Sequence, residues 1–344
     1  MIRAGFHQLS IIVMCGAVCA CGRLHYEVGR ADAAVRDAGP PDGPMPDAFV
    51  PDGGDLDSSL SDDLGPMDAD SPDAITGDSG PAPSGWGAPM PVAGILTAGG
   101  EYQPTLTRDG LRICFTSNRG GGGSIDLFCA DRATVADVFS APYALDSVNA
   151  PAATDRMPAL SADGSELFFV SDRGGNDDIF RATWSVPRAS YQLDGVVVEL
   201  TTLDDEGGPE LSPSGREIFF DRRPGGASSR ILVATRSSAG AIFGAPVEIA
   251  PLVSSADDSE PAIGDDGDTM VFCTTRVAPA RPVSSTLFMS VRVGSVFGPP
   301  TPVEALELEL RGVCSPALVR GDLYYNTVLP SGPGGSDIVI ARPL

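Results

Sequence analysis

The stretch Met157-Pro158-Ala159-Leu160-Ser161-Ala162-Asp163-Gly164 decides the fold, because it recurs along the chain. Further copies occupy residues 103–110, 208–215, 260–267 and 315–322. Their anchoring prolines are Pro104, Pro158, Pro209, Pro261 and Pro316. The steps between these prolines are 51 to 55 residues long. A period near 50 residues is typical of a stacked or radial repeat, and the content of the repeat decides between them.

The remainder of each repeat predicts β-strands. An apolar run such as Leu167-Phe168-Phe169-Val170 follows the Asp-Gly pair, then a Gly-rich turn, then a second run such as Asp178-Ile179-Phe180. This order indicates strands joined by hairpins, and the Asp-Gly pairs are interpreted as turns rather than metal loops. A further element begins at an aromatic residue, namely at Phe139, Tyr191, Phe243 and Phe297. Four antiparallel strands per repeat are the blade of a β-propeller.

The position of the aromatic element predicts how the ring closes. Its first copy, Trp86-Gly87-Ala88-Pro89, precedes the first full repeat, and no copy follows the fifth repeat. We therefore expect the N-terminal strand to complete the last blade, which leaves no open sheet edge. The predicted fold class is all-β, a five-bladed propeller over residues 86–344.

One segment of the second repeat resembles a known family. Residues 169–180, Phe-Val-Ser-Asp-Arg-Gly-Gly-Asn-Asp-Asp-Ile-Phe, resemble the repeat of TolB-type, WD-repeat-like propellers, and a degraded form recurs over residues 100–344. The resemblance implies a propeller of the periplasm or cell envelope that binds protein or glycan ligands and has no catalysis of its own. Well-known members have six blades and a second domain, so their specific partners are not carried over.

Composition excludes several function classes. The formal net charge of −23 disfavours nucleic acid, whose phosphates need a basic face. All 23 basic residues are Arg, which removes Schiff-base chemistry and the phosphate-loop lysine. The histidines, His7 and His25, both precede the repeats, so a Ser-His-Asp site, a Cys-His site and a histidine zinc site are not expected in the propeller. We expect no cofactor and no metal.

The N-terminus predicts export and a lipid anchor. Residues 1–20 carry Arg3 and then a ten-residue apolar run, which is too short to span a membrane and reads as a signal peptide. The segment Val18-Cys19-Ala20-Cys21 resembles the lipobox of bacterial lipoproteins, which implies a lipid on Cys21 as the mature N-terminus, with Cys19 as the alternative. An ordinary secretory signal is the competing interpretation. Gly22 in place of Asp favours the outer membrane.

Residues 21–85 form an expected tether. Asp, Pro, Gly, Ala and Ser dominate this stretch, a composition that cannot bury enough apolar surface to fold. Asp recurs there every five residues, but the run lacks the pattern of a calcium loop, so we interpret it as a solvated spacer. Its expected span is on the order of 45 Å, enough to lift a monomeric domain clear of a membrane.

Acidic and arginine residues recur in step with the anchoring prolines. Three residues before the proline stand Glu101, Asp155, Glu206 and Asp258, with Val313 in the fifth repeat. Fifteen residues after it stand Arg119, Arg173 and Arg276, with Arg223 one position early and Ser331 in the fifth repeat. The acids could form an axial ring for a cation or a basic partner. Because acid and Arg are present and absent together, structural ion pairs are the preferred interpretation.

Four cysteines lie in the predicted propeller. Cys114 and Cys129 flank one Gly-rich turn symmetrically, so we hypothesise a Cys114–Cys129 disulfide and, with less support, Cys273–Cys314.

The sequence as a whole favours a non-catalytic binding or scaffolding lipoprotein for protein or glycan. The alternative is a glycosidase that uses central carboxylates of the propeller. Such a site needs carboxylates from different blades in different surroundings, whereas the inward acids recognised here look equivalent.

Overall fold

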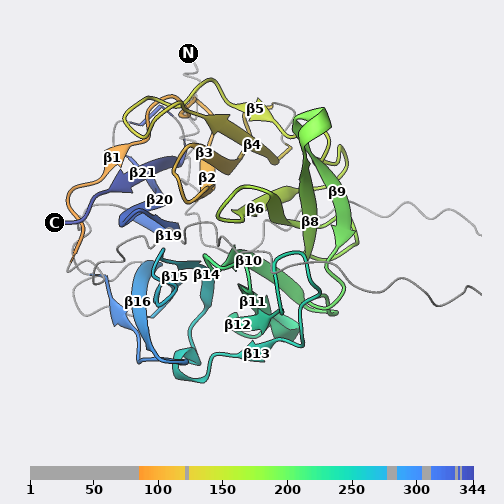
Figure 1. Cartoon of the computed structure of the whole chain (residues 1–344). Helices are drawn as coiled ribbons and strands as arrows, with labels where there is room; N and C mark the ends of the chain where they lie inside the picture. The colour runs from red at the N-terminus through yellow and green to blue at the C-terminus, as the bar shows by residue number, and fades with distance from the viewer. Residues whose placement is uncertain (1–84, 121–123, 277–284, 304–310, 330–331, 334) are drawn as a thin grey trace, which may run out of the picture. The chain divides into compact units, whose positions relative to one another are not determined.

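A computed structural model describes residues 85–120, 124–276, 285–303, 311–329, 332–333 and 335–344. Five antiparallel sheets are arranged radially around a central axis, as the blades of a propeller (Figure 1). The predicted all-β, five-bladed architecture is confirmed. The predicted signal peptide, Cys19, Cys21 and nearly all of the tether lie outside the described residues. Within the described residues no helix is long and apolar enough to cross a membrane.

Each blade runs from an inner strand at the axis to an outer strand at the perimeter, and the outer strand is short in every blade except blade 2. Blade 1 contains β2 (Glu101–Leu106), β3 (Arg112–Ser117), β4 (Asp126–Asp131) and β5 (Tyr143–Ala144). Blade 2 contains β6 (Asp155–Leu160), β7 (Glu166–Ser171), β8 (Asp178–Ser185) and β9 (Ser190–Val196). Blade 3 contains β10 (Asp205–Leu211), β11 (Glu217–Arg223), β12 (Arg230–Thr235) and β13 (Val247–Glu248).

The last two blades depart slightly from this plan. Blade 4 contains β14 (Asp258–Ile263), β15 (Thr269–Thr274) and β16 (Thr286–Val293), and two short outer strands, β17 (Val296–Phe297) and β18 (Thr301–Pro302), both pair with β16. Blade 5 contains β19 (Arg311–Val319), β20 (Asp322–Val328) and β21 (Asp337–Ala341), and its outer strand is β1 (Met90–Pro91). Three-residue 3-10 helices lie at Val186–Arg188, Pro224–Gly226 and Ala250–Leu252.

The ring closes through the N-terminal segment, as expected. Strand β1 pairs with β21 in the register Met90 to Ile340, and Trp86 forms an isolated bridge with Pro343. The Trp86 indole nitrogen donates a hydrogen bond to the Gly321 carbonyl at 3.0 Å, and the ring is only 2% exposed. The closing strand thus covers an edge that would otherwise stay open.

The local sequence explains the strands and their turns. Every residue of β7 is buried, and its core, Leu167-Phe168-Phe169-Val170, consists of apolar, β-branched and aromatic residues that favour strands. The preceding Asp-Gly turn needs a glycine, because Gly164 has φ of +70°. The Asp163 carboxylate accepts hydrogen bonds from the Ser165 backbone N–H and from the Ser161 and Ser165 hydroxyls. These internal bonds satisfy the turn without an ion.

The hydrophobic core is divided into five clusters, each between two neighbouring blades. One cluster, for example, joins Phe219 of blade 3 to Phe272, Phe288 and Phe297 of blade 4. Charged side chains add contacts between blades 2 and 3, where the fully buried Arg236 guanidinium donates two hydrogen bonds to the Glu166 carboxylate. The blades are therefore held together side by side.

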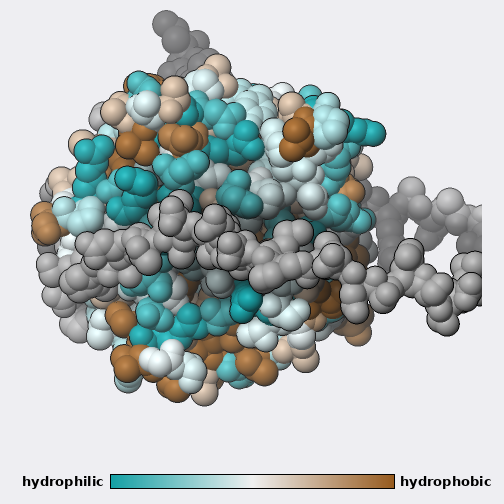
Figure 2. Space-filling view, viewed as in Figure 1, coloured by the Kyte–Doolittle hydropathy of each residue, from teal (hydrophilic) through white to brown (hydrophobic). Residues whose placement is uncertain are grey.

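The surface is mostly hydrophilic on the face shown in Figure 2, and apolar side chains are scattered toward its perimeter. The exposed large apolar residues include Val247 on β13, Val293 on β16 and Val296 on β17, all on outer parts of blades. Single exposed apolar residues are normal for soluble proteins.

Candidate functional site

The four acids of the expected axial ring are buried inside ion pairs. Their exposed fractions are 2% or less. The pairs are Glu101 with Arg119 at 3.0 Å, Asp155 with Arg173 at 2.5 Å, Glu206 with Arg222 at 2.8 Å and Asp258 with Arg276 at 2.8 Å. Each acid is the first or second residue of the inner strand of its blade, and each Arg comes from the end of the adjacent strand or the turn after it.

The hydrogen bonds around these pairs join consecutive blades. The Asp155 carboxylate also accepts a bond from the Ala150 N–H at 2.6 Å, and Arg173 also donates to the Val148 carbonyl at 2.9 Å. Both partners belong to the loop that leads from blade 1 into blade 2. The equivalent acids Glu101, Glu206 and Asp258 accept from Thr97, Thr202 and Ser254. The acids therefore fix loops and leave no carboxylate free for an axial ligand.

The third repeat departs from the expected Arg. Arg222, and not Arg223, pairs with Glu206, whereas Arg223 lies 3.3 Å from Asp257. The reason is local sequence: the other three pairs come from Ser117-Asn118-Arg119, Ser171-Asp172-Arg173 and Thr274-Thr275-Arg276. In the third repeat Arg222 itself stands opposite the acid on the strand, where the other three repeats have Ser117, Ser171 and Thr274, so its guanidinium projects from the strand itself. In the fifth repeat Val313 is buried, and Ser331 lies outside the described residues.

A backbone irregularity repeats five times at the axis. The residue before each anchoring proline has φ between +49° and +55°, and the inner strand has a register shift there. These residues are Gln103, Met157, Gly208, Glu260 and Ser315. A residue before proline normally adopts an extended conformation, and left-handed backbone is costly for any residue but glycine. The bulges direct these five positions toward the centre of the ring.

The five bulges line one cavity. Its wall consists of the five residues before the prolines, the five prolines, and Glu210. Its volume is about 30 Å³, room for about two water molecules. Two of its lining side chains, Glu210 of blade 3 and Glu260 of blade 4, are carboxylic acids. Sequence reasoning did not identify either of them.

A third acid, Asp221 of β11, lies beside this cavity and explains Gly208. A Cβ on Gly208 would stand 2.7 Å from Asp221 Oδ1 and 2.7 Å from Glu260 Cα. The other four blades all carry a side chain at the position of Gly208, so the left-handed backbone alone does not demand glycine. The Asp221 carboxylate occupies the space that a side chain at position 208 would need. Glycine and aspartate are thus spatially complementary.

Hydrogen bonds run around the axis and end on Glu260. The Met157 N–H donates to Gln103 Oε1 at 3.2 Å, and the Glu260 N–H donates to Asp221 Oδ1 at 3.0 Å. The Ser315 hydroxyl donates to Glu260 Oε2 at 2.5 Å, and Gln103 Nε2 donates to Glu260 Oε1 at 3.5 Å from across the axis. Both oxygens of Glu260 are therefore held, by blades 1 and 5.

Burial raises the pKa of all three axial acids. It raises the pKa of Glu210 to about 8, against one hydrogen bond from the Ile263 N–H that lowers it. Burial, with the neighbouring Glu260 charge, raises the pKa of Asp221 to about 7. The pKa of Glu260 is also raised by burial, although the bonds from Ser315 and Gln103 oppose the shift. Within the described residues none of the three forms an ion pair.

The axial acids occupy columns of the repeat that hold other residues in the other blades. At the position of Glu210 the other blades have Thr105, Ala159, Ala262 and Ala317. At the position of Asp221 they have Thr116, Val170, Cys273 and Asn326. The useful signal would have been a column that carries a carboxylate in one copy only. The acids predicted from the sequence, Glu101, Asp155, Glu206 and Asp258, instead stand at a position that carries a carboxylate in four of the five repeats.

Both hypothesised cysteine pairs are joined in the structure. Cys114 and Cys129 face each other on β3 and β4, with Cα atoms 4.0 Å apart. Cys273 of β15 and Cys314 of β19 connect blades 4 and 5, with Cα atoms 5.2 Å apart. The second disulfide lies directly beside the axis, because Cys314 immediately precedes Ser315.

Comparisons with known proteins show the fold. No family model matches the chain, and no curated protein matches it. A family 117 glycoside hydrolase from Zobellia galactanivorans has a similar structure with a TM-score of 0.51 and 11% identity, over 74% of this chain and 88% of the other. The α-L-arabinofuranosidase from Podospora anserina, solved with cellotriose, gives a TM-score of 0.50 and 11% identity, over 76% and 98%. At such identities the likeness shows the propeller alone.

TolB from Acinetobacter baumannii is also among the similar structures. The TM-score is 0.38 and the identity 18%, over 60% of this chain, and the chain spans 46% of TolB. The resemblance of the repeat to TolB-type propellers therefore extends to a structural neighbour, but too weakly to carry a functional argument.

The expectation that this chain is not an enzyme is wrong on these findings. The two neighbours with TM-scores of at least 0.50 named above are glycoside hydrolases. The argument against catalysis also assumed that the inward acids are equivalent. Glu101, Asp155, Glu206 and Asp258 are indeed alike, but the acids at the axis are Glu210, Asp221 and Glu260, which differ in position, partners and pKa.

Proposed function

We propose that this chain hydrolyses glycosidic bonds with the axial carboxylic acids of blades 3 and 4. The observation that carries the proposal is the set Glu210, Asp221 and Glu260 beside a water-sized cavity, three non-equivalent acids for which the described part of the chain provides no ion-pair partner. Glycoside hydrolysis needs one carboxylic acid that stays protonated at the working pH and a second carboxylate that is ionised. The fold shared with two glycoside hydrolases supports this choice over other acid-base reactions.

The surroundings of each acid suggest its role. Burial raises the pKa of Glu210 to about 8, and its carboxylate has a single N–H partner, which is the environment of a general acid that protonates the leaving oxygen. Both oxygens of Glu260 accept hydrogen bonds, which oppose the rise of its pKa by burial and make it the candidate for the base or nucleophile. The Asp221 carboxylate accepts a hydrogen bond from the Glu260 N–H. Because the two carboxyl groups are neighbours, a negative charge on Glu260 raises the pKa of Asp221. The cavity has room for the attacking water.

The test is release of reducing sugar by the purified full chain from arabinoxylan, arabinan, xylan and synthetic aryl glycosides. We expect turnover on at least one of them. Glu210→Gln and Glu260→Gln should each lower kcat by roughly 100-fold or more, in line with the loss of a general acid or base. Glu248→Gln is the matched control, because Glu248 lies exposed on the outer strand β13 and should keep full activity.

The pH profile distinguishes the two acids. Activity should decline at alkaline pH as Glu210 loses its proton, and Glu210→Gln should remove that limb from any residual activity. Correctly folded protein that releases no sugar from any of these substrates would contradict the proposal. Turnover that survives both axial substitutions would assign the chemistry elsewhere.

A further inference from the structure

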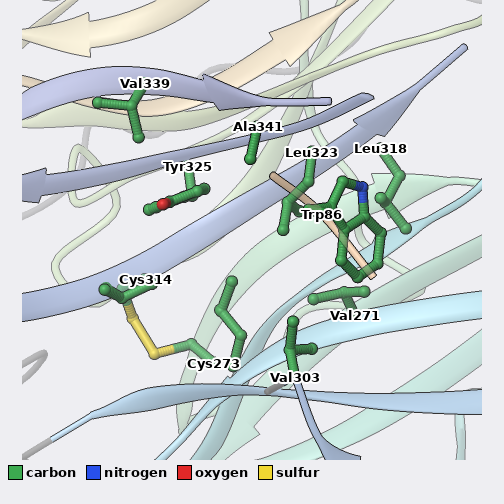
Figure 3. Close-up of a cluster of buried hydrophobic side chains, with 12 residues drawn as sticks. Trp86, Val271, Cys273, Val303, Cys314, Leu318, Leu323, Tyr325, Val339 and Ala341 are labelled. Carbon is green, nitrogen blue, oxygen red and sulfur yellow. A yellow bond between two sulfur atoms is a disulfide. The ribbon is translucent and has the colours of Figure 1, made fainter. Parts of the chain in front are cut away.

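The disulfide between blades 4 and 5 lies next to the axial acid Glu260. A carboxylate oxygen of Glu260 and the Sγ atoms of Cys273 and Cys314 all lie within 4.8 Å of one another. The exposed fractions are 6% for Glu260, 2% for Cys273 and 3% for Cys314. Figure 3 shows the disulfide at the edge of the apolar cluster that contains Tyr325 and Val271. Three groups from three strands, β14, β15 and β19, therefore converge on one buried point.

The fold fixes this convergence. Cys273 is paired with Ser259 on the neighbouring strand, one residue before Glu260. Cys314 stands one residue before Ser315, whose hydroxyl holds Glu260 Oε2. Because the left-handed bulges at Glu260 and Ser315 set both backbones, the two sulfurs and the carboxylate stay close whether or not the sulfurs are bonded to each other.

Two thiolates and one carboxylate are a ligand set for a soft or borderline divalent metal. Zinc binds Cys sulfur at about 2.3 Å and carboxylate oxygen at about 2.0–2.2 Å, and sites with three protein ligands keep a fourth position open for water. Here Glu260 and Ser315 line the axial cavity, so the fourth position faces a space of about 30 Å³. In the disulfide form the sulfurs are not thiolates and provide no such site.

We propose that the reduced chain binds one zinc-type divalent metal ion through Glu260, Cys273 and Cys314. A dithiol reductant first converts the disulfide to two thiols while the reductant itself is oxidised to a disulfide, a two-electron exchange that takes up no other reactant. Binding of the divalent ion then releases the two thiol protons, and the ion is held by two thiolates and one carboxylate. The oxidation state of Cys273 and Cys314 thus decides whether the axis holds a metal.

The other disulfide is a matched control within the same chain. Cys114 and Cys129 are also fully buried, in blade 1, yet within the described residues no third ligand of the His, Cys, Asp or Glu type completes a metal-binding group there. Reduction of that pair gives two thiols without a carboxylate partner. If the metal site depends on Glu260, metal binding requires Cys273 and Cys314 but does not require Cys114 and Cys129. Adventitious binding to thiols would occur at both pairs.

The experiment uses the full chain with Cys15, Cys19 and Cys21 replaced by Ser, so that only the propeller thiols remain. The protein is produced in a reducing cytoplasm, and Co²⁺ is added as a spectroscopic probe for Zn²⁺. We expect one equivalent of Co²⁺ with a thiolate-to-cobalt charge-transfer band, displaced by Zn²⁺. The air-oxidised protein should show no band. X-ray absorption on the zinc form should show two sulfur ligands.

Three variants decide the outcome. Cys273→Ser should abolish the band, and Cys114→Ser/Cys129→Ser should keep it unchanged. Glu260→Gln should weaken binding by more than the roughly 10–100-fold typical of losing an outer-shell partner. Circular dichroism and thermal unfolding establish that each variant is folded. A band that persists in Cys273→Ser, or reduced wild-type protein that shows none, would overturn the proposal.

The metal site is independent of glycoside hydrolysis, and the two proposals fail separately. Metal binding is measured without any sugar, and hydrolysis is measured on the oxidised chain. If both hold, zinc should inhibit turnover of the reduced chain only, because the ion occupies Glu260.

Discussion

Two sets of carboxylates lie in the inner part of the propeller, and they behave in opposite ways. Glu101, Asp155, Glu206 and Asp258 repeat from blade to blade, and each is matched by an arginine. Glu210, Asp221 and Glu260 occur once each, and within the described residues none has an arginine within ion-pair distance. The first set joins consecutive blades. The second set lies at the axis on blades 3 and 4, where burial raises the pKa of acids that have no counter-charge at ion-pair distance in the described residues.

The contrast teaches how a repeat protein separates structure from chemistry. An interaction that every blade needs must recur, because each blade packs on its neighbour in the same way. A site on the axis is made by all blades together, so a single departure in one blade is enough to change it. Recurrence is therefore a sign of a structural role, and isolated departures such as Gly208 with Asp221 mark the candidate site.

The largest expected difference between the two sets is in stability. Asp155→Asn leaves the partly buried Arg173 guanidinium without its counter-charge, so we expect a loss of about 3 kcal/mol in the free energy of unfolding. Glu260→Gln replaces an acid whose pKa is already raised with a neutral isostere, so the change should stay within about 1 kcal/mol. Urea denaturation followed by fluorescence measures both. Equal losses of unfolding free energy in Asp155→Asn and Glu260→Gln would contradict a structural role that is confined to the recurring acids.

A smaller effect is expected where Gly208 makes room for Asp221. Gly208→Ala should cost about 2 kcal/mol more than Gly225→Ala. Gly225 has the same φ of +49° but nothing within 4 Å of an added Cβ, so it reports the backbone cost alone. In an Asp221→Ala background the excess cost at position 208 should fall, although part of it should remain because an added Cβ would also stand 2.7 Å from Glu260 Cα. A double-mutant cycle by urea denaturation measures this coupling, and additive effects would speak against spatial complementarity.

A further prediction concerns the slope of stability with pH. Acids whose pKa is raised on folding bind protons more tightly in the native state than in the unfolded state. The stabilisation that Glu210 contributes is fully present below pH 4.5, the pKa of the residue in the unfolded chain. It is lost as the pH rises through about 8, the pKa of Glu210 in the folded protein. Stability should therefore fall between pH 5 and pH 8. Glu210→Gln should flatten that slope, and Asp155→Asn should leave it in place.

Much of the fold could be predicted from the sequence, because the same strand and turn signals occur in each repeat. Five anchoring prolines, the Asp-Gly turns and the early aromatic copy at Trp86 predicted five blades and the closing strand. The symmetric placement of Cys114 and Cys129 around a glycine-rich turn led to that pairing as a hypothesis. These features are local or periodic, so each of them can be recognised within a short segment of the sequence.

The axial site was not accessible in this way. The carboxylates of Glu210 and Asp221 each occur in one repeat only, and Glu210 and Glu260 both stand within the anchoring motif as if they were ordinary strand residues. Only the left-handed bulge turns position 260 toward the axis, and only the neighbouring blades supply Gln103 and Ser315. Arg222 was missed for a similar reason. Spacing along the chain predicted an Arg in the turn after the strand, but in the third repeat an Arg on the strand itself pairs with Glu206.

The sequence by itself determined the number of blades, the strand order and the seam, because hydrophobic alternation and turn chemistry act over a few residues and repeat. The tertiary structure alone decided which carboxylates meet. Residues 103, 221 and 260 come together only when the ring closes, and their burial in that closed centre is what raises the pKa of the two acids. Charge in a low-dielectric interior depends on distances that span the whole circle, and no local pattern encodes them.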